Sequence, residues 1–204
     1  TSAMKTRLSA AALVIALASG CANGSDANPS PTMSPSPSSP SASATTSTTP
    51  VPDGTAAVYW VADSGMGLVL YREYIKAPAG SDPAVIALKH IVADGTESVD
   101  GDYENMWGNG STINSVTYSG ELATVDLTIK RLNVGALSEQ RAIDQLVWSL
   151  TENHPQTTQV LFKSDGHPLE SFAGHVDARA AFARQPAFEV LAPIWIDRSE
   201  EHTS

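Results

Sequence analysis

The sequence predicts an α+β fold: a two-layer sandwich in the order ββαββαβ, with two helices on one face of a mixed sheet. Three observations support this prediction. Apolar runs that are rich in β-forming residues occur in pairs around glycine-containing turns, as in β-hairpins. Two other segments repeat apolar residues at helical spacing behind a helix-start signal. Hairpins and helices also alternate along residues 56–177, which favours helices packed against one face of a sheet.

The first hairpin and the first helix are expected between residues 57 and 94. Residues 57–61 and 68–74 are rich in β-forming side chains and flank a glycine-containing turn. A helix should start at Asp82, because aspartate is a favoured N-cap and Pro83 suits the first helical position. The helix should end near Asp94, where a glycine follows. Its apolar stripe comprises Val85, Leu88, Ile91 and Val92.

The second hairpin and the second helix follow the same logic. Residues 116–118 lead into a turn, and residues 123–129 then alternate apolar and polar side chains, the pattern of a strand that is buried on one face. We expect Ser138 to cap the second helix and Pro155 to stop it. Residues 159–163 read as a last strand, because an Asp-Gly turn follows them.

The N-terminal region resembles a lipoprotein leader. A basic start precedes the apolar residues 8–18, which are too few to span a bilayer, since that needs about 20. Residues 18–21 (ASGC) resemble a lipobox, although Ala18 stands where leucine is usual. We expect residues 1–20 to be a signal peptide and Cys21, the only cysteine, to carry a lipid anchor on the outer face of the bacterial cell membrane. The alternative is an ordinary signal peptide with an incidental cysteine.

A tether and an artefactual end are expected around the domain. We expect residues 21–55 to be a disordered linker, because residues 28–52 contain seven Pro, eight Ser and five Thr and no charged residue. At the other end, residues 198–204 (RSEEHTS) resemble the in-frame translation of a common sequencing adapter. The native sequence should therefore either stop near Asp197 or continue beyond it with different residues.

Composition and motifs argue against several functions. The formal net charge is −10 and no basic stripe occurs, so nucleic acid is not an expected partner. The chain has no Gly-x-Ser-x-Gly motif, and its cysteine lies in the lipobox, so no covalent nucleophile is evident. His167 and His175 with two nearby aspartates lack a zinc-ligand spacing, and the acidic residues 94–104 lack EF-hand spacing. We therefore expect no enzyme activity, no metal and no cofactor.

Aromatic residues are the speculative binding candidates. Trp107 lies in a polar loop of Gly and Asn, where a tryptophan serves either as a buried anchor or as an exposed binding residue. Tyr59 and Tyr71 lie on the first hairpin, where they could face a partner or pair across the strands. The sequence favours the anchor for Trp107 and leaves the tyrosines open.

Four segments together resemble the GerMN domain of sporulation and spore germination proteins. Each segment is mainly a core pattern, and the order and spacing carry the resemblance, which spans residues 56–177. Residues 104–112 depart from it, because relatives often have a Pro-x-Gly-Thr turn there. The four segments are 58–61 (VYWV), 123–127 (ATVDL), 142–151 (AIDQLVWSLT) and 160–166 (VLFKSDG).

The resemblance implies a non-enzymatic lipoprotein whose domain mediates protein–protein interaction or assembly outside the membrane. Implied partners are envelope proteins, among them a sensor histidine kinase or a sporulation complex. Within the tail, residues 178–197, the end resembles the entry into an immunoglobulin-like Gmad2 domain; the alternative is a terminal strand packed on the GerMN domain. An alternative function is an extracytoplasmic ligand-binding protein or a hydrolase acting on cell-wall material.

Overall fold

The computed structural model describes residues 50–192, except 109, 131 and 133. The first seven elements have the predicted order ββαββαβ, so the α+β class is confirmed. Within the described residues, no helix is long and apolar enough to cross a membrane. The elements are β1 (Thr55–Asp63), β2 (Leu68–Lys76), α1 (Pro83–Val92), β3 (Thr112–Ser119), β4 (Leu122–Thr128), α2 (Ala136–Asn153), β5 (Gln159–Ser164), β6 (His167–Pro168), β7 (Phe182–Ala183) and α3 (Ala187–Val190).

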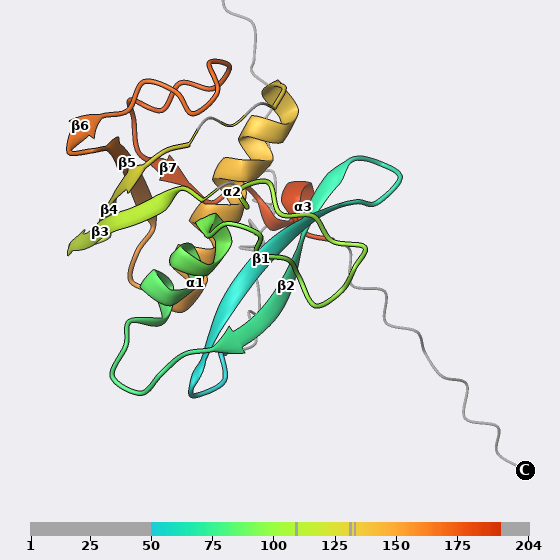
Figure 1. Ribbon diagram of the computed structural model, residues 1–204, viewed down its shortest axis with the longest axis horizontal. Helices are drawn as coiled ribbons and strands as arrows, with labels where there is room; N and C mark the ends of the chain where they lie inside the picture. The colour runs from blue at the N-terminus through green and yellow to red at the C-terminus, as the bar shows by residue number, and fades with distance from the viewer. Residues whose placement is uncertain (1–49, 109, 131, 133, 193–204) are drawn as a thin grey trace, which may run out of the picture. The chain divides into compact units, whose positions relative to one another are not determined.

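The strands form two sheets, whereas a single sheet was expected. β1 and β2 make an antiparallel pair of nine residues each. The second sheet has the order β3-β4-β5-β6, and β7 pairs with β5 as well. It is mixed, as predicted, because β4 and β5 are parallel while the other pairs are antiparallel. Figure 1 shows α1 and α2 side by side between the strand pair β1–β2 and the second sheet.

Side chains and a loop, not a strand, occupy the second edge of β1. Asn153 of α2 binds both backbone groups of Ala57, and the Ser149 hydroxyl accepts a hydrogen bond from the Tyr59 N–H at 3.0 Å. Further along, Val61 exchanges two backbone hydrogen bonds with Glu104. Since these groups already satisfy the edge of β1, no further strand adds there, and the sheet is divided.

One core joins both helices to both sheets. The apolar sides of α1 and α2 pack on the inner faces of β1, β4 and β5. Trp60, Trp107 and Phe162 are among its largest buried side chains. A smaller core lies on the other face of β1, around Tyr59 and Trp148. Both helices therefore cover one face of the mixed sheet, as predicted.

The two helix starts differ in how well the sequence predicts them. α1 begins as expected: the Asp82 carboxylate accepts a hydrogen bond from the Ala84 N–H at 2.9 Å, and Pro83 is the first helical residue. The expected Ser138 cap of α2 was wrong, because the cap lies three residues earlier, at Gly135. Gly135 has no side chain to cap the helix, so the sequence offers a weaker start signal there than at Ser138.

Candidate functional site

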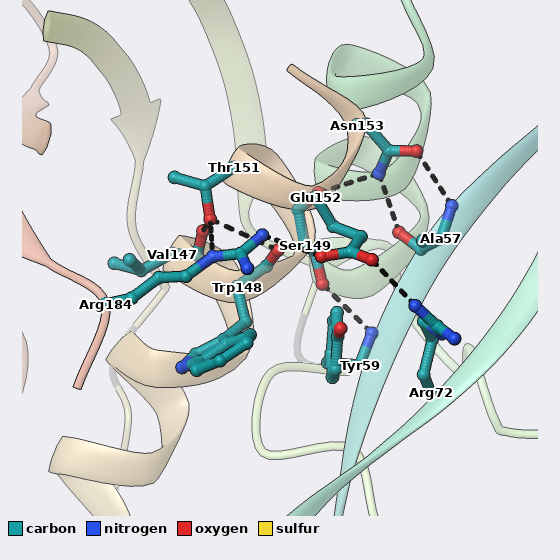
Figure 2. A network of polar contacts seen from close by, with 10 residues as sticks. All are labelled: Ala57, Tyr59, Arg72, Val147, Trp148, Ser149, Thr151, Glu152, Asn153 and Arg184. Carbon is teal, nitrogen blue, oxygen red and sulfur yellow. Dashed lines mark hydrogen bonds and ion pairs between the residues drawn. The ribbon is translucent and has the colours of Figure 1, made fainter. Parts of the chain in front are cut away.

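A buried ion-pair network lies on the C-terminal half of α2 (Figure 2). Each oxygen of Glu152 binds a different arginine: Oε1 accepts from Arg72 Nη1 at 2.7 Å, and Oε2 accepts from Arg184 Nη2 at 2.8 Å. The Glu152 side chain is only 4% exposed. Arg72 comes from β2, and Arg184 follows β7. The carboxylate therefore ties α2 to segments that are 80 and 32 residues away in sequence.

Aromatic rings surround the two arginines. The Arg184 guanidinium carbon lies 4.3 Å from the centroid of the Trp148 ring, and that of Arg72 lies 5.2 Å from the Tyr74 ring. Arg184 also donates through Nε to the Thr151 hydroxyl at 2.6 Å. Cation–π contacts of this kind hold the arginine against the aromatic ring, and they are stronger when the cation is partly removed from water.

Tyr59 lies beneath this network and is 2% exposed. Its ring centroid is 5.6 Å from that of Trp148. Burial, followed by the negative charge of Glu152, raises the pKa of Tyr59 to about 12. The phenol is therefore protonated at neutral pH, and its buried position suits packing better than proton transfer.

Glu152 and the nearby His154 both make contacts within the domain. Both oxygens of Glu152 are held by arginines, so neither oxygen is free to contact a substrate. His154 contacts the Thr157 hydroxyl through Nδ1 at 2.8 Å, but this pair closes the turn behind α2, where the Thr157 N–H also donates to the His154 carbonyl. In the described part of the chain, we find no carboxylate hydrogen-bonded to that imidazole, as a catalytic triad would need.

A pocket of about 620 Å³ adjoins the network. This volume lies within the range of small-molecule sites, which is roughly 300–1,000 Å³. Glu152 and Arg184 reach it from the ion-pair network, and hydroxyl, amide and apolar groups supply the rest of the wall. The lining residues are Pro50, Val51, Thr151, Glu152, Asn153, Pro155, Thr157, Thr158, Ala183 and Arg184.

A second buried carboxylate, Glu139, organises the loop after β6. It is fully buried in the first turns of α2. Its oxygens accept hydrogen bonds from the Ser171 hydroxyl and from the N–H groups of Phe172, Ala173 and His175, at 2.8–3.1 Å. Burial alone would raise the pKa of Glu139, but these hydrogen bonds outweigh burial and hold the pKa below its ordinary value. The structure assigns Glu139 to holding this loop.

The sequence-predicted binding residues are not brought together. Trp107 is buried, donates through Nε1 to the Ala142 carbonyl at 2.8 Å and packs edge-on against Phe172, so it is the anchor that the sequence favoured. Tyr59 belongs to the other core. Their burial leaves neither ring free for a partner. Tyr71 is half-buried and stacks on Tyr103, with ring centroids 4.5 Å apart. Cys21 lies outside the described residues.

The histidines and acidic residues that the sequence singled out form no metal site in the described segments, where no three His, Cys, Asp or Glu side chains group around a common point. Several acidic side chains instead bind backbone. Glu73 accepts hydrogen bonds from the N–H groups of Val99 and Asp100, and Asp100 accepts one from Asp102. A polar pocket of about 500 Å³ lies along this loop, between Gly95 and Gly108.

Neither Glu152 nor Glu139 was singled out from the sequence. Each lies in a helix, where a glutamate is normally predicted to be exposed to solvent. The available signal was their position: Glu139 lies near the start of α2, where a carboxylate is favoured by the helix dipole, and Glu152 lies at its end, where it is not. A glutamate at a helix end needs another partner, and the two arginines supply it.

The chain is similar to known sporulation proteins in both sequence and fold. The family model described as "Sporulation and spore germination" matches residues 57–170, more than half of the chain. No curated protein gives a significant match. Among solved structures, the first GerMN domain of the sporulation protein GerM from Bacillus subtilis is 18% identical, with a TM-score of 0.49 over 61% of this chain and 92% of that chain.

Two further structures are similar. The tandem GerMN domains of the same Bacillus subtilis protein are 15% identical, with a TM-score of 0.49 over 64% of this chain and 44% of that chain. A candidate lipoprotein from Clostridium perfringens is 13% identical, with a TM-score of 0.45 over 64% of this chain and 88% of that chain. The family assignment rests on the family model. The chain belongs to the family of sporulation and spore germination domains.

Proposed function

We propose that this protein is a non-enzymatic cell-envelope lipoprotein whose GerMN domain binds other proteins outside the membrane. The observation that carries the proposal is the use of its buried charged groups. The Glu152 oxygens bind two arginines, and the Glu139 oxygens accept hydrogen bonds from a hydroxyl and from backbone N–H groups. Both sets of contacts hold distant segments together. These groups build a rigid domain, and that leaves its surface as the part that acts.

The proposed domain organisation places this surface away from the membrane. In this proposal the leader, residues 1–20, is removed and Cys21 carries the lipid. Residues 21–55 form the tether, whose Pro-rich part could extend to roughly 80 Å at about 3.1 Å per residue. The GerMN domain follows at residues 56–177, and residues 178–197 either begin a Gmad2 domain or form a terminal segment that packs on the GerMN domain. The lipid must provide the attachment, because a chain of net charge −10 is not attracted to anionic lipids.

Envelope proteins are the proposed partners, and the extracytoplasmic part of a sensor histidine kinase is one candidate. The test is chemical crosslinking in the native cells, followed by affinity purification of the full-length lipoprotein. A Cys21→Ala variant is the unanchored control. We expect one envelope protein to be recovered reproducibly with the native chain and to be depleted with the control. Recovery of no protein above background from the anchored chain would contradict the proposal.

The 620 Å³ pocket supports a second candidate function, the binding of a small extracytoplasmic ligand such as a cell-wall fragment. A thermal-shift screen with soluble wall fragments tests it, with Thr158→Trp as the variant that places a bulky side chain at an exposed residue of the pocket lining. A shift in melting temperature that disappears in Thr158→Trp supports ligand binding. Identical melting curves with and without every fragment contradict it.

A further inference from the structure

β3 presents the least protected sheet edge in the described part of the chain. It is the terminal strand of its sheet, it has eight residues, and its sequence TINSVTYS contains no charged residue and no proline. The outer edge of β2 carries Arg72, Glu73 and Lys76, and its start already pairs with Leu191. β6 and β7 are only two residues long. Edges that must remain unpaired usually carry charges or proline, and β3 has neither.

The hairpin geometry identifies which backbone groups of β3 point outward. β3 and β4 are joined by the two-residue turn Gly120–Glu121, whose first residue has a φ of +58°, as in a type II′ turn. In such a hairpin the closing pair, Ser119 and Leu122, is hydrogen-bonded, and bonded pairs then alternate along the ladder. The N–H and C=O groups of Val116 and Tyr118 therefore point away from β4. Among the described residues, we find no hydrogen-bond partner for these outward groups.

This edge is held in a fixed position. The Tyr118 hydroxyl donates to the Asp82 carboxylate at 2.7 Å, at the start of α1. The Tyr118 ring stacks on His154 at the end of α2, with centroids 4.0 Å apart and planes 13° apart. A β-bulge between Ile113 and Ser115 bends the beginning of β3 and leaves the regular stretch after it. A pre-ordered edge costs less conformational entropy when it pairs.

We propose that a second copy of this chain pairs with the β3 edge, antiparallel and around a two-fold axis at Thr117. In this register Val116 of each copy faces Tyr118 of the other, so that the outward groups make four backbone hydrogen bonds. The edge is thus complementary to itself, as a two-fold interface requires. The proposed occupant is a second copy, because paired β3 strands would not repel each other. The chain as a whole has a net charge of −10, but β3 contains no carboxylate.

The inference shares one assumption with the proposed function, namely that the domain acts through contacts with proteins.

The test is analytical ultracentrifugation of the chain from residue 21 onward, with Cys21→Ser to prevent lipidation. Thr117→Lys places two ammonium groups together at the axis. Thr124→Lys is the matched control, because Thr124 is the partner of Thr117 on β4, one strand away from the edge. Val116→Pro removes an outward N–H without removing a hydrogen bond to β4.

We expect a dimer whose dissociation constant rises at least tenfold in Thr117→Lys and in Val116→Pro and is unchanged in Thr124→Lys. Circular dichroism and melting curves check that each variant is folded. A monomer at every concentration overturns the inference, and so does a dimer that tolerates Thr117→Lys. Either of those results leaves the crosslinking test of an envelope partner untouched, so failure of the dimer and failure of the proposed function are distinguishable.

Discussion

Asn153 binds both backbone groups of Ala57, although the two residues are 96 positions apart. Its Oδ1 accepts from the Ala57 N–H at 2.8 Å, and its Nδ2 donates to the Ala57 carbonyl at 2.8 Å. The amide side chain thus takes the place of a neighbouring strand on β1. This contact helps to fix α2 against the strand pair, and it closes an edge along which β1 could otherwise pair with other chains.

Asn153→Ala should lower the free energy of unfolding by about 2 kcal/mol, because it leaves both groups of Ala57 without their partner in a part-buried place. Urea denaturation followed by circular dichroism measures the change. Asn114→Ala is the matched control, since the one partner of its amide among the described residues is the exposed Thr128 hydroxyl, and it should change stability by less than about 0.5 kcal/mol. Equal effects of the two substitutions would contradict the role given to Asn153.

Glu152→Gln should destabilise the protein by about 3 kcal/mol, because it removes the charge that neutralises Arg72 and Arg184. The exposed pair of Asp177 and Arg179 is the control: Asp177→Asn should leave the denaturation midpoint unchanged. If Glu152→Gln unfolds at the same urea concentration as the native chain, the network does not hold the domain together.

Glu139 predicts a specific dependence of stability on pH. Its folded pKa lies below the ordinary value of 4.5, so its contribution is fully present above pH 4.5 and is lost as the pH falls through the folded value. Glu139→Gln should therefore lower the free energy of unfolding by about 2 kcal/mol at pH 7, and the difference from the native chain should shrink below pH 4.5. Denaturation at a series of pH values measures it. A difference that grows in acid would contradict the assignment.

Trp107 tests the distinction between an anchor and a binding residue. Trp107→Ala should cost about 3–5 kcal/mol of stability, as for other buried aromatic residues. Trp107→Phe keeps most of the ring and loses the bond to the Ala142 carbonyl, so it should cost about 1–2 kcal/mol. Guanidinium denaturation distinguishes these values. A stable Trp107→Ala protein with lost partner binding would restore the exposed interpretation.

Local sequence patterns predicted the elements well where the signals act over a few residues. The Asp82-Pro83 helix start, the alternation of residues 123–129 and the Asp165-Gly166 end of β5 all correspond to observed features. Asp165 has a φ of +51°, which an aspartate tolerates better than most residues. These features depend on backbone preferences and on one-sided burial, and both can be read from neighbouring residues.

Long-range contacts were not predictable in the same way. The division into two sheets depends on Asn153 and Ser149 reaching β1 from about 90 residues away. The burial of Glu152 depends on arginines from two other segments. A single sequence gives the period of a helix but not which polar residue on it meets a distant partner. For the same reason, the sequence could name Tyr59 as a candidate without showing that it is buried.

The most direct test of the central claim, that the domain acts by binding proteins through its surface, is site-specific photocrosslinking in the native cells. A photoreactive residue replaces Tyr71 on the face of β2 or Thr117 on β3, and buried Trp148 serves as the internal control. The account predicts that a surface position gives a discrete adduct with an envelope protein or a second copy, while position 148 gives none. Absence of any protein adduct at both surface positions, with the lipoprotein folded and anchored, would contradict it.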